Sequence, residues 1–203
     1  MLSGDSLAQY QRVVVELGMG DGRLLEALAR ASSDSLFFGI EIDPAQCDAA
    51  RYRTAQLQNV RVLEGSYEQL IIEFPNESVD EFIAILPDPA CIDEKKQDEW
   101  THFYRRVYEK LKRGGRLRVV TELTDELLQP VSVETCARWK TWLDETFTSI
   151  GFSLEVAMDG APAEYSSRCL DQFRGDPERI KIVTMDLAKL HFKIARREKQ
   201  LSA

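Results

Sequence analysis

The residues best suited to bind a ligand form a glycine-rich segment, Glu16–Gly22, whose sequence is ELGMGDG and which ends an apolar run. Glycines permit a tight turn and let a bound molecule approach the backbone closely. The spacing is Gly-x-Gly-x-Gly, and Arg23 stands where a dinucleotide-binding loop has its third glycine. The chain also lacks the Gly-Lys-Ser/Thr of a phosphate-binding loop. The segment therefore argues against a dinucleotide and against a P-loop ligand.

Glu41 is the second residue whose position indicates binding chemistry. It stands nineteen positions after Gly22, directly after the apolar run Leu36–Ile40. At the end of a second strand, an acid can accept hydrogen bonds from both hydroxyls of an adenosine ribose. The glycine segment and Glu41 together therefore indicate a nucleoside site. The alternative is that Glu16 and Glu41 are solvated acids at strand ends and that the glycines form a plain turn.

Three further polar residues, Ser66, Asp88 and Glu122, follow or end other apolar runs. The carboxyl ends of parallel strands meet at one edge of an open sheet, where α/β folds bind their ligands. We therefore expect these side chains to converge with the two acids named above. Prolines on both sides restrict the backbone around Asp88, although Pro-Asp-Pro also suits a rigid turn with no further role.

The elements that must position these residues follow from the alternation of short apolar runs with amphipathic stretches, which is typical of an α/β fold. The predicted strands are Val13–Leu17, Leu36–Ile40, Val60–Leu63, Phe82–Leu86 and Leu117–Thr121. The predicted helices include Ala45–Leu57, Tyr67–Phe74, Gln97–Leu111 with a stop at Gly114-Gly115, and a stretch around Trp139–Phe147. This order predicts a doubly wound, Rossmann-like and mostly parallel sheet.

The C-terminal part departs from the alternation, because Leu154–Ala157 and Ile180–Met185 read as successive strands with no helix between them. They predict a seven-stranded sheet with an antiparallel last strand. The segment 158–179 is too long for a hairpin turn and is a candidate substrate loop. Residues 187–200 predict a terminal helix with a basic end, and we expect a single domain over residues 1–203.

The composition, 44% apolar and 30% charged over 203 residues, suffices for one folded core and excludes disordered, collagen-like and coiled-coil classes. A formal net charge of −8 argues against nonspecific nucleic-acid binding over the whole surface, but leaves a local basic patch open. No apolar stretch approaches a membrane span and no signal peptide is evident, so we expect a cytoplasmic protein. The four cysteines never form Cys-x-x-Cys, which favours reduced thiols and no metal site.

The glycine segment, the acid that begins it and Glu41 together resemble the S-adenosylmethionine (SAM) site of class I methyltransferases. The resemblance implies SAM as the cofactor, with the loop around its methionine part and Glu41 on the ribose. Ser66 matches the position that contacts the adenine in that class. The cofactor-binding residues that the resemblance implies are Glu16, Gly18, Gly20, Gly22, Glu41, Ile42, Ser66, Tyr67 and Asp88.

Within that class, the chain is most similar to the tRNA (guanine-N7)-methyltransferase family. The motifs that carry this resemblance are Glu16–Gly22, Gly39-Ile40-Glu41, Pro87-Asp88-Pro89, Gly114-Gly115 and Thr121-Glu122, where the family has Thr-Asp in the last. The resemblance implies that Asp88 is the catalytic residue, that Glu122 holds the guanine or its nucleotide, and that the partner is tRNA.

The segment after Asp88 departs from that family, which has Trp directly after Pro-Asp-Pro and then a dense run of Lys and Arg. Residues 90–96 here read ACIDEKK. Lys95, Lys96 and Arg105 are the substrate-binding candidates, within basic clusters that suit phosphate but also fit a solvated face. A small-molecule or ribosomal RNA methyltransferase and a non-catalytic relative that binds only the cofactor stay open, as do a monomer and a homodimer.

Overall fold

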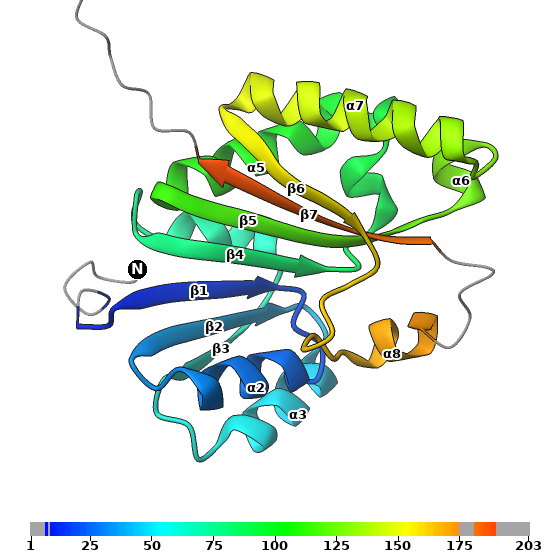
Figure 1. Ribbon diagram of the computed structural model, residues 1–203. Coiled ribbons are helices and arrows are strands. Elements are labelled where there is room, and N and C mark those ends of the chain that lie inside the picture. The colour runs from blue at the N-terminus through cyan, green and yellow to red at the C-terminus, as the bar shows by residue number, and fades with distance from the viewer. Residues whose placement is uncertain (1–6, 8, 175–180, 190–203) are drawn as a thin grey trace, which may run out of the picture.

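The computed structural model describes residue 7, residues 9–174 and residues 181–189, and its centre is a seven-stranded sheet of order β3-β2-β1-β4-β5-β7-β6 (Figure 1). The strands are β1 (Arg12–Leu17), β2 (Ser35–Glu41), β3 (Val60–Glu64), β4 (Val79–Ile85), β5 (Leu111–Leu123), β6 (Phe152–Asp159) and β7 (Lys181–Lys189). Strand β7 runs antiparallel to both β5 and β6, and the other neighbouring pairs are parallel. The predicted fold class is confirmed.

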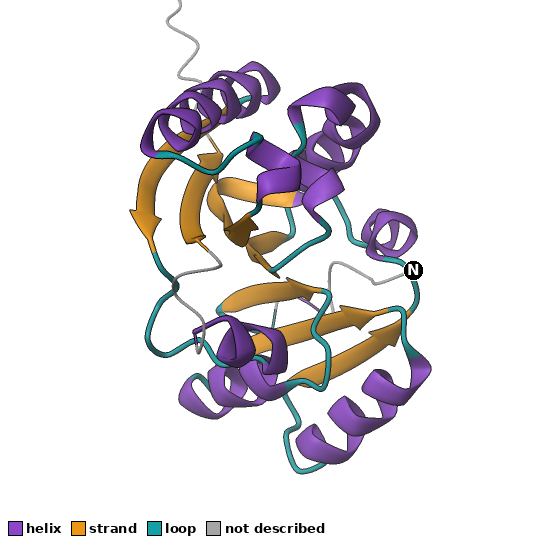
Figure 2. Ribbon diagram, turned by 90° about the vertical axis from the view of Figure 1, so that its right-hand side faces the viewer, coloured by secondary structure: helices purple, strands orange, loops and turns teal. Residues whose placement is uncertain are grey.

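Helices cover both faces of this sheet (Figure 2). They are α2 (Arg23–Ala31), α3 (Pro44–Thr54), α4 (Tyr67–Leu70), α5 (Gln97–Lys110), α6 (Asp125–Leu128), α7 (Val133–Ile150) and α8 (Arg168–Arg174). One apolar cluster unites the sheet with α5 and α7, and a second unites it with α2, α3 and α8. In the part of the chain that the structure describes, no helix is long and apolar enough to cross a bilayer.

The sequence explains why α2 begins where the glycine segment ends. Gly22 is the N-cap of α2 and has a φ of +75°, in the left-handed region that glycine adopts at low cost. Leu24, Leu25 and Ala29 are the buried residues of this helix. Their helical spacing turns one side of α2 toward the sheet, which fixes the glycine segment at the carboxyl end of β1.

The prediction that no helix separates the last two strands is wrong, because α8 lies between β6 and β7. This helix has only seven residues, and among its described side chains Leu170 is the buried apolar one, so it shows little of the periodicity that identifies longer helices. The candidate loop 158–179 therefore contains the end of β6, the whole of α8, and residues 175–179, which lie outside the described part.

Two other boundaries also differ from the prediction. Strand β5 begins at Leu111, so Gly114 and Gly115 lie inside the strand instead of stopping α5. The register between β4 and β5 shifts there, and a Cβ on Gly115 would lie 3.0 Å from the Asp80 carbonyl oxygen, so this close approach requires glycine. Residues 187–189 belong to β7, not to a terminal helix; residues 190–200 of that predicted helix lie outside the described part.

Candidate functional site

A cavity of about 660 Å³ lies at the carboxyl ends of β1, β2 and β4, with α8 on one side. Its volume falls within the roughly 300–1,000 Å³ of small-molecule sites. In Figure 1, α8 stands on the side toward which the arrowheads of β1 and β4 point. The lining residues are Glu16, Leu17, Gly18, Met19, Gly20, Asp21, Glu41, Asp43, Gln46, Tyr67, Ile85, Leu86, Pro87, Asp88, Ser167, Arg168, Cys169 and Gln172.

The three glycines of the segment serve different purposes. Gly18 and Gly20 line the cavity with positive φ angles, and a Cβ built on either one would meet no atom within 4 Å. The space beside them is therefore open to a ligand. A Cβ on Gly22 would lie 2.8 Å from the Ala50 Cβ, so the third glycine permits close packing of α2 on α3 and does not line the cavity.

Glu16 is the most unusual group in the cavity. Its side chain is buried, with 2% of the residue exposed, and among the described residues its Oε2 atom has no hydrogen-bond partner. Burial, followed by the charges of Asp21 and Glu41, raises the pKa of Glu16 to about 8. A buried carboxyl group without a partner is costly, so this atom indicates a site for a ligand that donates a hydrogen bond or carries positive charge.

Glu41 is held rigidly at the end of β2 and connects it to the glycine segment. Its Oε2 accepts a hydrogen bond from the Gly20 amide at 3.0 Å, and its Oε1 accepts from Ile42 and Asp43 at 2.8 and 3.0 Å. A carboxylate offers about four acceptor positions, so Oε2 keeps the capacity to accept another hydrogen bond. The carboxylate lines the cavity and is thus oriented before any ligand binds.

Asp88 lies at the rim, where two cavities meet. It lines the large cavity and also a smaller one of about 190 Å³, to which Lys96 and Glu126 contribute. Its Oδ1 accepts a hydrogen bond from the Ala90 amide at 2.8 Å, which fixes the turn after β4. Leu86, two residues earlier, has a φ of +51°, an uncommon angle for a residue with a side chain. Strain of this kind is consistent with a site held for function.

Six of the nine cofactor-binding candidates line the large cavity: Glu16, Gly18, Gly20, Glu41, Tyr67 and Asp88. Gly22, Ile42 and Ser66 do not. Ile42 is nevertheless 69% exposed beside Glu41, which is unusual for a large apolar side chain, and the Ser66 hydroxyl donates to the Glu68 carboxylate. The roles of these three residues remain predictions.

The substrate-binding candidates are distributed more widely. Lys96 lines the smaller cavity, whereas Lys95 and Arg105 are exposed and line neither cavity. Glu122 is partly buried near the end of β5, and burial together with the nearby Glu126 charge raises its pKa. The structure thus leaves the predicted roles of Lys95, Arg105 and Glu122 untested.

Several lining residues were not anticipated from the sequence. Asp43 caps α3 by accepting from the Ala45 amide at 2.8 Å, and its Asp-Pro sequence is a recognisable helix start. The residues of α8 that reach the cavity gave no comparable signal, since their contribution depends on how the chain returns over the sheet. These residues are Arg168, Cys169 and Gln172, and Ser167, directly before the helix, also lines the cavity.

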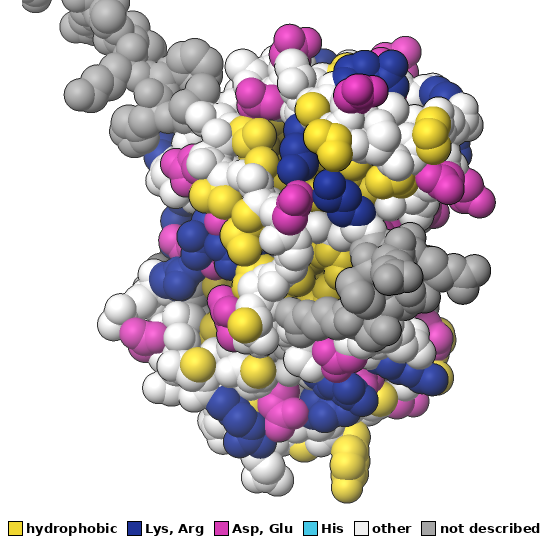
Figure 3. Space-filling model, turned by 45° about the vertical axis from the view of Figure 1, so that its right-hand side comes forward, with side chains coloured by type: hydrophobic (Ala, Val, Ile, Leu, Met, Phe, Trp, Pro, Cys, Tyr) yellow, Lys and Arg dark blue, Asp and Glu magenta, His cyan; other side chains and the backbone are white. Residues whose placement is uncertain are grey.

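The surface near α8 carries mixed charge. In Figure 3, Lys and Arg side chains alternate with Asp and Glu over the described residues of this face, and they form no broad basic area. The overall charge of −8 agrees with this pattern. Any contact with a polyanion on this face would therefore involve a few local basic side chains.

Comparisons with known proteins come from both sequence and structure. Residues 10–146 match a family described as "Putative methyltransferase". A tRNA (guanine-N(7)-)-methyltransferase of Thermus thermophilus is 32% identical over 125 residues, covering 54% of this chain and 37% of that protein. Another with this name, from Acinetobacter baylyi, is 34% identical over 122 residues, covering 54% of this chain and 46% of its own length. The matches thus span less than half of these two relatives.

Among solved structures, the crystal structure of a 16S rRNA methyltransferase, KamB, superposes with a TM-score of 0.72. The match covers 92% of both chains at 17% sequence identity. The likeness therefore extends over nearly the whole chain, and at this identity it concerns the fold alone.

Proposed function

Because the chain belongs to the putative methyltransferase family, we propose that it transfers a methyl group from SAM to N7 of a guanine in tRNA. The cofactor follows from the family and from the character of the cavity. The nucleobase and the RNA follow from the relatives that bear this activity in their names. A cytoplasmic location is part of the same proposal.

The observation that carries the proposal is the buried Oε2 atom of Glu16, which has no hydrogen-bond partner among the described residues. SAM, when bound, supplies a methyl group on a positively charged sulfur, together with a protonated amine. Either positively charged group could interact with the Glu16 carboxylate, and this interaction would lower the pKa of Glu16 from about 8. The residues present therefore fit this cofactor.

The remaining lining residues fit the nucleoside part of SAM. Oε2 of Glu41 has acceptor capacity for a ribose hydroxyl, and the carboxylate is already oriented by three amides. The exposed Ile42 side chain beside it offers an apolar surface to a purine face. Tyr67 lines the cavity from α4, with its hydroxyl 3.6 Å from the Cys91 sulfur. We assign Ser66 and Tyr67 to the adenine side on the family resemblance.

Asp88 is the proposed catalytic residue. N7 of guanine carries a lone pair, so no proton has to be removed before it accepts the methyl group. Positive charge grows on the purine as the methyl group arrives, and a carboxylate close to the ring stabilises that charge. Because Asp88 lines both the cofactor cavity and the smaller cavity, a base in the smaller one would lie beside Asp88 and next to the cofactor. The chain's main contribution is alignment of the two reactants.

Recognition of tRNA would depend on a few basic side chains near the smaller cavity and on α5. Lys96 is the basic residue at the smaller cavity, and we propose that it and Lys95 contact phosphate beside the target nucleotide, with Arg105 farther along α5. Glu122 would hold the guanine. These contacts are few, so binding should depend on salt less steeply than for proteins with many phosphate contacts. A monomer and a homodimer both remain compatible with this arrangement.

The direct test is to incubate the protein with isotopically labelled SAM and unmodified tRNA, digest the RNA and identify labelled nucleosides by mass spectrometry. We expect labelled 7-methylguanosine. The variant Asp88→Asn should retain cofactor binding and lose about 100-fold or more in rate, on the scale of removing one electrostatic stabiliser.

A labelled product other than 7-methylguanosine, or label transferred only to ribosomal RNA or a small molecule, would overturn the proposed substrate. Full activity of Asp88→Asn would overturn the catalytic role of the carboxylate. Absence of SAM binding, measured separately by calorimetry, would overturn the proposed cofactor.

A further inference from the structure

The charges around the large cavity are strongly unequal. Five of its lining residues are acidic, namely Glu16, Asp21, Glu41, Asp43 and Asp88. Arg168 is the one basic residue among the described residues that line it. SAM carries positive charge on its sulfur and amine but negative charge on its carboxylate. The acids suit the first two groups, so the carboxylate needs a different partner in this cavity.

The amides of the glycine segment are not free to serve as that partner. The N–H groups of Gly18 and Met19 both donate to the Ile40 carbonyl, at 2.9 and 3.0 Å. The Gly20 amide donates to Glu41 at 3.0 Å. These bonds hold the end of β1 against the end of β2, so the three amides are already satisfied. A carboxylate bound here gains no hydrogen bond from these three amides, so we expect its charged donor on another wall of the cavity.

Helix α8 forms that wall and is connected directly to the glycine segment. The Arg23 side chain lies between the two, with its Nε 3.1 Å from Asp21 Oδ2 and its Nη1 3.6 Å from Asp171 Oδ2. Asp171 also accepts from the Ser166 hydroxyl at 3.0 Å. Arg168 therefore lies on an element next to the glycine segment, the part of the site expected to surround the methionine portion of SAM.

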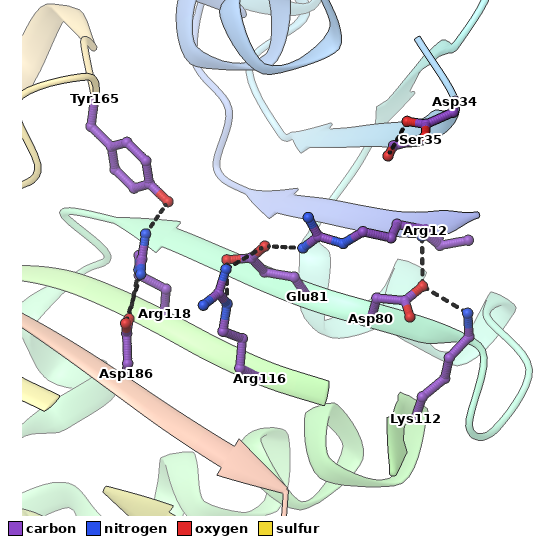
Figure 4. Close-up of polar contacts among 11 residues, drawn as sticks. Arg12, Asp34, Ser35, Asp80, Glu81, Lys112, Arg116, Arg118, Tyr165 and Asp186 are labelled. Carbon is purple, nitrogen blue, oxygen red and sulfur yellow. Dashed lines mark hydrogen bonds and ion pairs between the residues drawn. The ribbon is translucent and has the colours of Figure 1, made fainter. Parts of the chain in front are cut away.

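The start of α8 is anchored firmly to the sheet. Tyr165 is 3% exposed, and its hydroxyl accepts a hydrogen bond from Arg118 Nη1 at 2.9 Å. Arg118, on β5, is in turn held by Asp186 on β7 through two hydrogen bonds of 2.6 Å (Figure 4). Leu170, which follows residues 166–169 along the chain, is also fully buried. Arg168 and Cys169, which line the cavity, therefore lie between two buried anchors.

We propose that Arg168 binds the carboxylate of the methionine portion of SAM and that Tyr165 is a positioning residue for it. The inference rests on the proposed function, since it takes SAM as the cofactor. Arginine suits the task because its planar guanidinium donates two parallel hydrogen bonds to a carboxylate. Tyr165, Arg118 and Asp186 supply the fixed support that such a contact requires.

The test compares three ligands by isothermal titration calorimetry: SAM, decarboxylated SAM and 5′-methylthioadenosine. Decarboxylated SAM lacks only the carboxylate, and methylthioadenosine lacks the whole amino-acid portion. The wild-type protein should bind SAM about 10- to 100-fold more tightly than decarboxylated SAM, the range for hydrogen bonds between charged groups. Arg168→Gln should reduce this ratio to near one and leave the affinity for methylthioadenosine unchanged.

Matched variants separate a direct contact from a general loss of structure. Arg138→Gln, an exposed arginine of α7 away from both cavities, should keep the wild-type ratio. Tyr165→Phe should lower the ratio by several fold without affecting methylthioadenosine, because it loosens the support of Arg168 while the Arg118–Asp186 pair persists. Arg168→Lys should restore part of the ratio, since lysine keeps the charge but not the bidentate geometry.

An unchanged ratio in Arg168→Gln would overturn the inference while leaving the proposed function intact. A selective loss of tRNA affinity in that variant, with normal cofactor discrimination, would also overturn it and assign Arg168 to the RNA. Failure of the wild-type protein to bind any of the three ligands would instead contradict the proposed function itself.

Discussion

Two groups of buried charges on the same sheet differ in how they are satisfied. On β4, β5 and β7, Glu81 accepts from Arg12 at 2.7 Å and from Arg116 at 2.9 Å, and Asp186 is held by Arg118 (Figure 4). At the carboxyl ends of β1 and β2, in contrast, Glu16 is more deeply buried than Glu81, 2% against 5%, and has an oxygen without a partner among the described residues.

The difference separates charges that are paired within the chain from an acid that, by our proposal, is paired by a ligand. A buried acid paired with arginine from a neighbouring strand is complete within the chain, and loss of one partner leaves an uncompensated charge. A buried acid that lines a cavity and has an oxygen without a partner is incomplete within the chain, and we expect a bound ligand to stabilise it. Perturbed groups of the second kind are typical of functional sites.

The largest effect on stability is expected from breaking the Arg118–Asp186 pair. Asp186→Asn removes the negative charge that faces Arg118, whose side chain is only 16% exposed. We expect the free energy of unfolding to fall by about 3 kcal/mol, on the scale of breaking a buried ion pair, as measured by chemical denaturation. A variant as stable as the wild type would show that solvent compensates the Arg118 charge. It would contradict the claim that the Arg118–Asp186 pair maintains the fold.

For Glu16→Gln we expect a smaller effect, and one on ligand affinity instead of on stability. The unliganded variant should be at least as stable as the wild type at pH 8, because it no longer buries a carboxylate. Its affinity for SAM should fall about 10-fold or more, since one charged hydrogen bond is lost. Calorimetric titration and denaturation of the same preparations give both values, and strong destabilisation without loss of affinity would contradict the distinction between the two groups.

The pH dependence of stability provides a finer test. The pKa of Glu16 in the folded protein is raised to about 8, above its usual 4.5. Between these values the folded state holds a proton that the unfolded state has released. The contribution of Glu16 to stability is therefore full below about pH 4.5 and is lost as pH rises to about 8, by at most roughly 1.4 kcal/mol per pH unit.

Denaturation of the unliganded protein at several pH values between 5 and 8 measures this slope, and Glu16→Gln is the control that should lack its contribution. Saturating SAM should also diminish the slope, since the bound cation favours the ionised carboxylate. Equal slopes for the wild type and the variant would mean that Glu16 titrates normally.

The sequence anticipated which residues lie together at the cavity where one short segment contains both the strand and the candidate residue. Glu16, Glu41 and Asp88 each end or closely follow an apolar run, and parallel strands bring such positions to one edge. Gly22 was predicted to bind the cofactor with the other two glycines; in the structure it permits close packing of α2 on α3, because Ala50 approaches it, and it does not line the cavity. Spacing alone could not distinguish these uses.

The sequence by itself determined the sheet class, the antiparallel last strand and the acids at the strand ends, because hydrophobic periodicity and turn residues are local properties. Only the tertiary structure decided that α8 forms a wall of the cavity, that Arg168 lines it, and that Tyr165 is anchored to Arg118, forty-seven positions away. These contacts depend on the path that the chain takes from β6 through α8 to β7. Pairing of charges has the same origin, since partners distant in sequence meet only when the strands are assembled.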